Sequence, residues 1–311
     1  MEVGSIVLPA ENAVSGSWAI DRYEVARPRL PGATFPKHSV FAASLAELKD
    51  EFDAFVFDSF GVLNVGDTPI DGACRRIEEL RNDGKQLAIL TNAATVPLGK
   101  LVHKYTQLGF QFEASEIISS REVLAGGLRC FDGEMRWGVA APLQSNIDEL
   151  PGRCHRLDTE TAGFNYADGF ILLSSQGWTL ELQSMLAEAL AGQPRPVLVG
   201  NPDIVAPREG GLSLEPGAYA HQIADALGVE PVFYGKPFGN AFAEVAGRFE
   251  PAVDPRRIVM IGDSFHTDIL GGAAAGWRTV LVTDHGLVKD LDVDALIKST
   301  HIVPDFIIPS I

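Results

Sequence analysis

Short apolar runs alternate with segments of helical spacing along most of the chain, and this alternation limits the possible folds more than any other feature. The runs at 54–57, 86–91 and 257–262 are apolar at nearly every position rather than at every second one. Strands of this kind are buried on both faces, which is typical of a parallel sheet covered by helices. The segment 72–84 between two of them has helical spacing and ends at Gly84. The sequence therefore predicts an α/β protein with a doubly wound parallel sheet.

The length of the chain predicts more than one domain. A chain of 311 residues is too long for one comfortable hydrophobic core. The alternation is regular over 41–130 and over 231–311, and less regular over 131–230, so we expect a core domain built from the first two segments with the third inserted as a cap domain. Residues 1–40 contain four prolines and no sustained periodicity. We expect an extended N-terminal arm there.

Composition and charge exclude several classes of function. The net charge of −16 argues against nucleic acids and anionic membranes as partners. No apolar run approaches the roughly 18 residues that a membrane helix needs, and the N-terminus lacks a signal-peptide pattern. Three widely spaced cysteines give neither a zinc pattern nor a disulfide framework, so we expect a cytoplasmic protein.

Polar residues follow three of the predicted strands. The run 54–57 is followed by Asp58, the run 86–91 ends in Thr91 and is followed by Asn92, and the run 257–262 is followed by Asp263. Any one of these residues could serve only as a helix cap or a turn residue. Because the carboxyl ends of parallel strands meet at one edge of the sheet, the set as a whole predicts a single site there.

The residue types at this predicted site fit one chemistry. Two carboxylates, from Asp58 and Asp263, are suitable ligands for Mg²⁺. Side chains at Thr91 and Asn92 can hold phosphoryl oxygens, and Lys236 can add a positive charge against the same group. The acidic surface makes such local cations necessary, because the overall field repels a phosphorylated ligand. With the charge neutralised, Asp58 can attack phosphorus and form an aspartyl-phosphate.

Four short motifs carry a resemblance to a known family. In chain order they are DSFGVL (58–63), LTNA (90–93), GKP (235–237) and GDSFHTD (262–268). Together they resemble the haloacid dehalogenase (HAD) superfamily of phosphatases. The stretch NPD (201–203) and the approach to GKP resemble its subfamily IIA, which includes 4-nitrophenylphosphatase-like sugar and nucleotide phosphatases. The resemblance covers about residues 50 to 290 and leaves out 1–40.

The resemblance implies a Rossmann-like core with an inserted α/β cap, and a small phosphorylated metabolite as substrate. It implies that Asp58 is the nucleophile and that Lys236 supports catalysis. A cap of this type could also mediate a homodimer. The residues implied to bind Mg²⁺ are Asp58, Phe60 (through its carbonyl), Asp263 and Asp268. The residues implied to bind the phosphate are Thr91, Asn92 and Lys236.

One position departs from the family pattern. The family's phosphatases carry a second aspartate two residues after the nucleophile, where it protonates the leaving oxygen and later activates water; here this position is Phe60. Such general acid–base help is typically worth about 10²–10⁴-fold in rate. The enzyme could therefore be slow or restricted to good leaving groups, or another residue could supply the proton. Candidates are a group from the cap, Asp67 or His266.

Phe60 also leaves two other functions open. The protein could bind a phosphorylated ligand and turn it over poorly or not at all. Alternatively, it could cleave carbon–halogen bonds, because the family's dehalogenases carry an aromatic residue at the position of Phe60. Those enzymes need no Mg²⁺ and lack the acidic fourth motif, which is intact here. The sequence thus favours a Mg²⁺-dependent phosphatase that works through Asp58.

Overall fold

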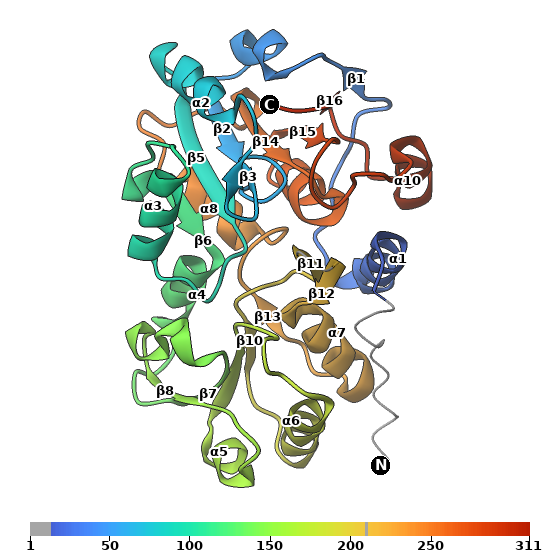
Figure 1. Ribbon diagram of the computed structural model, residues 1–311. Helices are drawn as coiled ribbons and strands as arrows, with labels where there is room; N and C mark the ends of the chain where they lie inside the picture. Colours follow the sequence, from blue (N-terminus) through green and yellow to red (C-terminus); the bar gives the residue numbers. More distant parts are fainter. Residues whose placement is uncertain (1–13, 209–210) are drawn as a thin grey trace.

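The computed structural model describes residues 14–208 and 211–311, which form two parallel sheets with helices packed on them (Figure 1). The larger sheet has seven strands, in the spatial order β1 (Val40–Phe41), β16 (Phe306–Ile308), β15 (Arg278–Val282), β14 (Ile258–Gly262), β2 (Ala54–Phe57), β5 (Gln86–Thr91) and β6 (Ile117–Ser119). Every adjacent pair in it is parallel. From β2 the chain winds outward through β5 and β6, then returns to β14 and winds outward the other way. This arrangement confirms the predicted doubly wound α/β fold.

The large sheet is buried on both faces, as its apolar strands predicted. Along β2, Phe55 and Phe57 pack with residues of one helical layer, whereas Val56 packs with residues of the other. Helices α2 (Ala73–Asn82) and α3 (Leu98–Gln107) contribute to the first layer. The remaining helices around this sheet are α4 (Ser120–Leu128), α8 (Gly239–Ala246), α9 (Leu270–Ala274) and α10 (Val293–Thr300). Short 3₁₀ helices lie at Arg27–Arg29, Leu45–Glu47, Lys49–Glu51, Ala114–Glu116, Leu143–Ser145, Ile147–Glu149 and Pro255–Arg257.

The second sheet lies below the first in Figure 1 and is built mainly from the predicted cap segment. Its five parallel strands run in the order β13 (Val232–Phe233), β10 (Val197–Val199), β9 (Gly169–Leu172), β7 (Arg136–Ala140) and β8 (Arg153–Arg156). The helices α5 (Thr161–Tyr166), α6 (Leu180–Gly192) and α7 (Pro216–Leu227) accompany it. Strand β13 belongs to this sheet although it lies in 231–311, so we propose a cap boundary a few residues after 230.

Two antiparallel hairpins lie outside these sheets. Strands β3 (Asn64–Val65) and β4 (Thr68–Pro69) form a small hairpin shortly after β2. Strands β11 (Val205–Arg208) and β12 (Gly211–Leu214) form another between β10 and α7. Within the described ranges, no helix combines the length and the apolar character that crossing a membrane requires.

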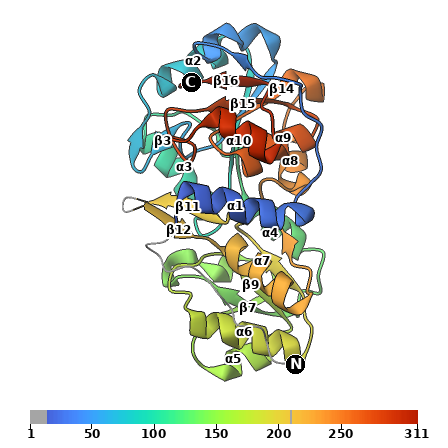
Figure 2. The same ribbon diagram turned by 90° about the vertical axis from the view of Figure 1, so that its right-hand side faces the viewer.

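The N-terminal segment is not a purely extended arm. Residues Gly16–Ala26 form helix α1, whose N-cap Ser15 accepts a hydrogen bond from the backbone N–H of Trp18. The prediction for 1–40 is therefore wrong over this stretch, while residues 1–13 lie outside the described part of the chain. Figure 2 shows α1 lying across the molecule between the large sheet and the second sheet. The prolines that suggested an irregular arm come after the helix or, for Pro9, before it.

Helix α1 packs into an apolar cluster shared with both parts of the molecule. Its buried residues Ala19 and Tyr23 belong to the same cluster as Phe170 of β9 and Leu281 of β15. At its C-terminal side, Arg29 forms a 2.5 Å ion pair with Asp225 of α7. The N-terminal segment therefore connects the core to the cap through side-chain packing as well as through charge.

Candidate active site

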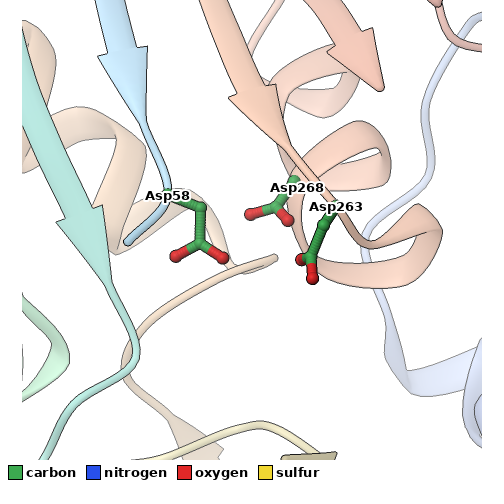
Figure 3. A group of neighbouring side chains, drawn as sticks. All are labelled: Asp58, Asp263 and Asp268. Atoms are coloured by element: carbon green, nitrogen blue, oxygen red, sulfur yellow. The ribbon is translucent and has the colours of Figure 1, made fainter. Parts of the chain in front are cut away.

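Three acidic side chains meet at the edge of the large sheet where its strand order reverses. Asp58 follows β2 and Asp263 follows β14, and these two strands are neighbours. Asp268 lies in a π-helical turn, Phe265–Ile269, that follows β14. Figure 3 shows the three carboxylates gathered around one point, and their ligand oxygens lie within 4.8 Å of one another. The structure thus brings three of the predicted metal ligands together.

Lys236 places a positive charge inside this acidic group. It lies between β13 and α8, and its Nζ is 2.6 Å from Asp58 Oδ1 and 2.7 Å from Asp268 Oδ1. Burial by itself lowers the pKa of Lys236, but the charges of Asp268 and Asp58 outweigh this effect and the pKa lies above its usual value. Lys236 is therefore a permanent cation next to the carboxylate of Asp58.

The carboxylates of Asp263 and Asp268 are held by backbone groups that approach them closely. Asp263 Oδ2 accepts a 2.7 Å hydrogen bond from the backbone N–H of Leu287. A Cβ atom at Gly286, whose φ is 72°, would lie only 1.6 Å from Asp263 Oδ2, so only glycine fits there. Asp268 Oδ2 accepts a 3.2 Å hydrogen bond from the N–H of Ser264, and a Cβ at Gly262 would lie 2.1 Å from the Asp268 side chain. The turn GDSFHTD thus needs its glycine to seat Asp268.

The residues present fit a divalent metal ion. Asp58, Asp263 and Asp268 supply three carboxylates, and the sole ion-pair partner that the described structure gives them is the ammonium of Lys236. Burial, followed by the charges of Asp58 and Asp268, raises the pKa of Asp263 well above its usual range. Burial also raises the pKa of Asp268 to about 7. Hard oxygen ligands with uncompensated negative charge are what Mg²⁺ or Ca²⁺ requires.

Asn92 has a role that the sequence did not reveal. Its Nδ2 donates to Asp203 Oδ1 at 2.8 Å and to the backbone carbonyl of Lys236 at 3.0 Å, while its Oδ1 accepts from the backbone N–H of Lys236 at 2.8 Å. The side-chain amide therefore contacts both Lys236 and Asp203, and Asn92 also lines the cavity described below, so its contact with a phosphate stays a prediction. Thr91 lines the cavity described below, and its Oγ1 accepts a 3.3 Å hydrogen bond from Ala93.

A cavity of about 250 Å³ lies against this group of residues. The core contributes Asp58, Thr91, Lys236 and Asp263 to its wall, together with Phe60. The segment from 201 to 215 contributes six more lining residues, and helices α1 and α3 add one residue each. These further lining residues are Tyr23, Lys104, Asn201, Asp203, Val205, Ala206, Pro207 and Glu215. The cavity is thus lined by parts of the chain that are far apart in sequence.

Comparisons with known proteins identify the family of the chain. Residues 55–139 match the model of the family described as haloacid dehalogenase-like hydrolase, and residues 233–310 match a model described as HAD-hydrolase-like. The chain is a haloacid dehalogenase-like hydrolase. The two matched stretches contain Asp58, Thr91 and Asn92 in the first and Lys236, Asp263 and Asp268 in the second.

Individual relatives of this HAD-like hydrolase cover most of its length. A 4-nitrophenylphosphatase of Schizosaccharomyces pombe is 23% identical, over 85% of this chain and 94% of the relative. A glycerol-3-phosphate phosphatase of Homo sapiens is 28% identical, over 84% and 89%. Among solved structures, a possible sugar phosphatase of the HAD superfamily from Cytophaga hutchinsonii superposes with a TM-score of 0.75 at 25% identity, over 90% of this chain and 98% of that chain. These matches agree with the resemblance to subfamily IIA.

Two of the proposed proton sources in this HAD-like hydrolase lie away from the cavity. Asp67 is exposed in the turn between β3 and β4. His266 is fully buried, stacks on Tyr23 at a ring-centroid distance of 4.8 Å, and has its Nε2 2.6 Å from Glu24 Oε1. Neither lines the cavity, whereas Phe60 does. Of the three sources considered, only a group from the cap segment remains.

Tyr23, Lys104 and Asp203 are among the cavity residues that escaped prediction, each for a different reason. Tyr23 lies in a segment that we expected to be extended. Lys104 lies on α3, where one lysine among several polar helix residues carries no signal of its own. Asp203 belongs to the NPD stretch that supported the family resemblance, but the sequence placed it only within the cap. Its proximity to Asn92, which is 111 positions earlier in the chain, is a property of the folded structure.

Proposed function

We propose that this HAD-like hydrolase is a Mg²⁺-dependent phosphatase that hydrolyses a small phosphorylated metabolite through a phospho-Asp58 intermediate. The observation that carries the proposal is the position of Asp58. Its carboxylate lines the cavity, 2.6 Å from the ammonium of Lys236 and beside two further buried carboxylates. The phosphatase names of the relatives support the same class of reaction.

Each residue of the site has a defined part in this reaction. Asp58, Asp263 and the carbonyl of Phe60 would hold Mg²⁺ with Asp268 beside them, and the ion when bound would supply positive charge against the phosphoryl oxygens. Lys236 adds charge to the same oxygens and pairs with Asp58 Oδ1 at 2.6 Å, and an oxygen of the Asp58 carboxylate would attack phosphorus. The hydroxyl of Thr91 can donate to a phosphoryl oxygen at the rim of the cavity.

The buried acidic group argues against the alternative of a metal-free dehalogenase. Such an enzyme needs one nucleophilic carboxylate, whereas here Asp263 and Asp268 add two more that Lys236 alone does not neutralise. The alternative of a binding protein without turnover makes a different prediction, because it requires phosphate affinity but no loss of substrate.

Hydrolysis of 4-nitrophenyl phosphate with and without Mg²⁺ tests the proposal. We expect turnover that requires Mg²⁺ and falls by at least about 10³-fold in Asp58→Asn, which keeps the shape of the side chain but removes the nucleophile. Mass spectrometry of the acid-quenched enzyme should show a phosphoryl adduct on the peptide containing Asp58. Turnover that is indifferent to Mg²⁺, or an Asp58→Asn variant with full activity, would contradict the proposal. Phosphate binding without turnover would favour the binding protein.

A further inference from the structure

This inference rests on the proposed function and concerns the proton that Phe60 cannot supply. When a phosphate monoester is cleaved, the leaving oxygen takes up negative charge unless an acid protonates it. The attacking and leaving oxygens lie roughly in line with phosphorus, so the leaving oxygen lies on the side away from Asp58. Besides residues of the core, six residues of the segment from 201 to 215 line this cavity. An acid among them would share the cavity with the leaving group.

Asp203 is the carboxylic acid of this segment that is both near the site and rigidly held. Its Oδ1 accepts a 2.8 Å hydrogen bond from Asn92 Nδ2, and Asn92 in turn holds the backbone of Lys236. The N–H of Asp203 donates to Asn201 Oδ1 at 3.0 Å, and its carbonyl accepts from the N–H of Gly217 at 3.0 Å. This turn therefore has little freedom to move relative to Lys236.

The first residues of α7 pack tightly against the turn that contains Asp203. A Cβ atom at Gly217 would lie 2.1 Å from the carbonyl oxygen of Pro202 and 2.6 Å from that of Asp203. A catalytic group must be held close to its productive position, and positions fixed by several contacts meet this need better than flexible ones. From this geometry we infer that Asp203 is the general acid and base of the reaction, in the role that Phe60 vacates.

The other titratable groups of the cavity wall are less suitable. The carboxylate oxygens of Glu215 accept hydrogen bonds from Asn201 Nδ2 at 3.1 Å and Ser213 Oγ at 2.7 Å. Burial raises the pKa of Tyr23 well above its usual value, so its hydroxyl is a poor acid. Lys104 is a long, partly exposed side chain on α3, and burial lowers its pKa. It is the competitor that the experiment has to separate from Asp203.

The protonation of Asp203 agrees with the role. Burial raises its pKa to about 7, although Lys236 and the hydrogen bond from Asn92 act in the opposite direction. The negative charges of Asp58 and Glu215 raise it further. A group that first gives up a proton and later takes one works best when its pKa lies near the working pH.

The two steps balance with Asp203 as the only proton carrier. In the first, Asp58 forms a bond to phosphorus, the bond from phosphorus to the leaving oxygen breaks, and that oxygen takes the proton of Asp203. In the second, a water molecule gives a proton to the carboxylate of Asp203 and attacks phosphorus, while the electron pair of the breaking bond returns to Asp58. The alcohol and inorganic phosphate leave, and Asp203 is protonated again.

Dependence on the leaving group tests the inference. We would compare kcat/KM for 4-nitrophenyl phosphate, whose leaving group needs little protonation, with that for phenyl phosphate, whose leaving group is more basic. Asp203→Asn keeps the size and the contact with Asn92 but cannot give up a proton. We expect it to lose about 10²-fold or more on phenyl phosphate, within the range of general acid catalysis, and less than about 10-fold on 4-nitrophenyl phosphate. Asp67→Asn is the matched control and should leave both values unchanged.

Equal losses on both substrates, or no loss on either, would overturn the inference, because a merely structural residue would not distinguish the leaving groups. A selective loss on phenyl phosphate in Lys104→Met, with none in Asp203→Asn, would assign the role to Lys104 instead. Wild-type protein inactive on both substrates would refute the proposed function, and this inference with it.

A second pair of variants does not depend on Asp203→Asn folding well. Phe60→Asp restores the family's usual acid. In the wild-type background we expect it to raise kcat/KM for phenyl phosphate only slightly, because Asp203 already supplies the proton, and in the Asp203→Asn background we expect it to recover most of the selective loss. A gain of about 10² or more in the wild-type background would show that the reaction lacks an acid, and would refute the role of Asp203.

Discussion

Lys236 is the residue on which the electrostatic balance of the site depends. Its ammonium lies within 2.7 Å of two carboxylates, and its side chain is almost completely buried. Taking several charges out of water is costly, and the arrangement is stable only while each has its partners. Removing the cation would leave Asp58 and Asp268 facing each other in a poorly solvated site.

The first prediction concerns this cation. In Lys236→Met, without Mg²⁺ at pH 7, we expect the free energy of unfolding to fall by about 3–5 kcal/mol, the usual cost of breaking a buried ion pair. Urea denaturation would measure it. Lys49→Met, which removes a surface ion pair with Asp83, is the control and should change stability little. Similar small effects in both variants would show that Lys236 is not a structural cation.

The second prediction separates two roles of Asn92. If its amide holds Lys236 and Asp203, then Asn92→Ala should lose about 1–3 kcal/mol of stability, because it leaves the buried N–H of Lys236 unpaired. Asn92→Asp should lose more at pH 7, because an oxygen would then face Asp203 Oδ1 and the Lys236 carbonyl where Nδ2 now donates. A residue that only bound phosphate would show little change in urea denaturation without ligand.

For single residues, the sequence predicted which side chains belong to the site better than it predicted which of them contact one another. Asp58, Thr91 and Asp263 were placed together because strand ends in a parallel sheet share one edge. The contacts of Asn92 with Lys236 join positions 144 apart, and no local pattern encodes them. Asp203 was likewise recognisable only as part of the NPD stretch that supports the family resemblance. The sequence therefore located the cavity residues that follow the core strands, whereas those from the segment 201–215 required the folded structure.

Among the elements, α1 shows where prediction from sequence failed. Its buried residues are Ala19, Ile20, Tyr23 and Ala26, so two of the four apolar positions are alanines and the apolar periodicity is weak. The prolines that follow the helix further obscured it. The core strands β2, β5 and β14, by contrast, are apolar at nearly every position and were predicted within one residue, because burial on both faces leaves a strong signal.

The interface between α1 and α7 makes stability depend on pH. His221 of α7 is buried and stacks on Phe233 at a ring-centroid distance of 4.8 Å. Burial lowers the pKa of His221 to about 4, the nearby charges of Arg29 and Arg22 lower it too, and Asp225 acts in the opposite direction. In the unfolded chain the pKa should be the ordinary value of about 6.5. The folded state thus binds the proton less readily than the unfolded state.

The third prediction follows from the sign of this difference. The contribution of neutral His221 is fully present above about pH 6.5 and is lost as the pH falls toward 4. Lowering the pH from 7 to 5 should therefore reduce this contribution to the free energy of unfolding by about 2 kcal/mol. His221→Phe keeps a ring of similar size and does not titrate, so its stability should fall by about 2 kcal/mol less than that of wild type over this interval. Urea denaturation at both pH values would measure the difference, and parallel losses would contradict the assignment.

At the scale of the whole molecule, the two sheets do not have separate cores. One apolar cluster contains Phe170 of the second sheet, Leu281 of the large sheet and Ala19 of α1. A second cluster contains Leu124 of α4 together with Trp137 of β7. Apolar contacts of this extent make the free energies of the parts interdependent, so that one part loses packing when the other unfolds.

The last prediction is that core and cap unfold together and that α1 belongs to the same unit. Calorimetry of the wild type should show one transition, with calorimetric and van't Hoff enthalpies that agree. Ala19→Asp, which puts a charge at a fully buried position of α1, should lower the midpoint of that whole transition by about 2 °C or more for each kcal/mol of stability lost. Val25→Asp on the exposed face of the same helix controls for the added charge and should leave the midpoint nearly unchanged.

If α1 were only a surface arm, Ala19→Asp would behave like Val25→Asp. If the cap had an independent core, two transitions would be resolved. Because Tyr23 of α1 also lines the cavity, a shared transition would mean that the site loses its walls in the same event in which the fold is lost.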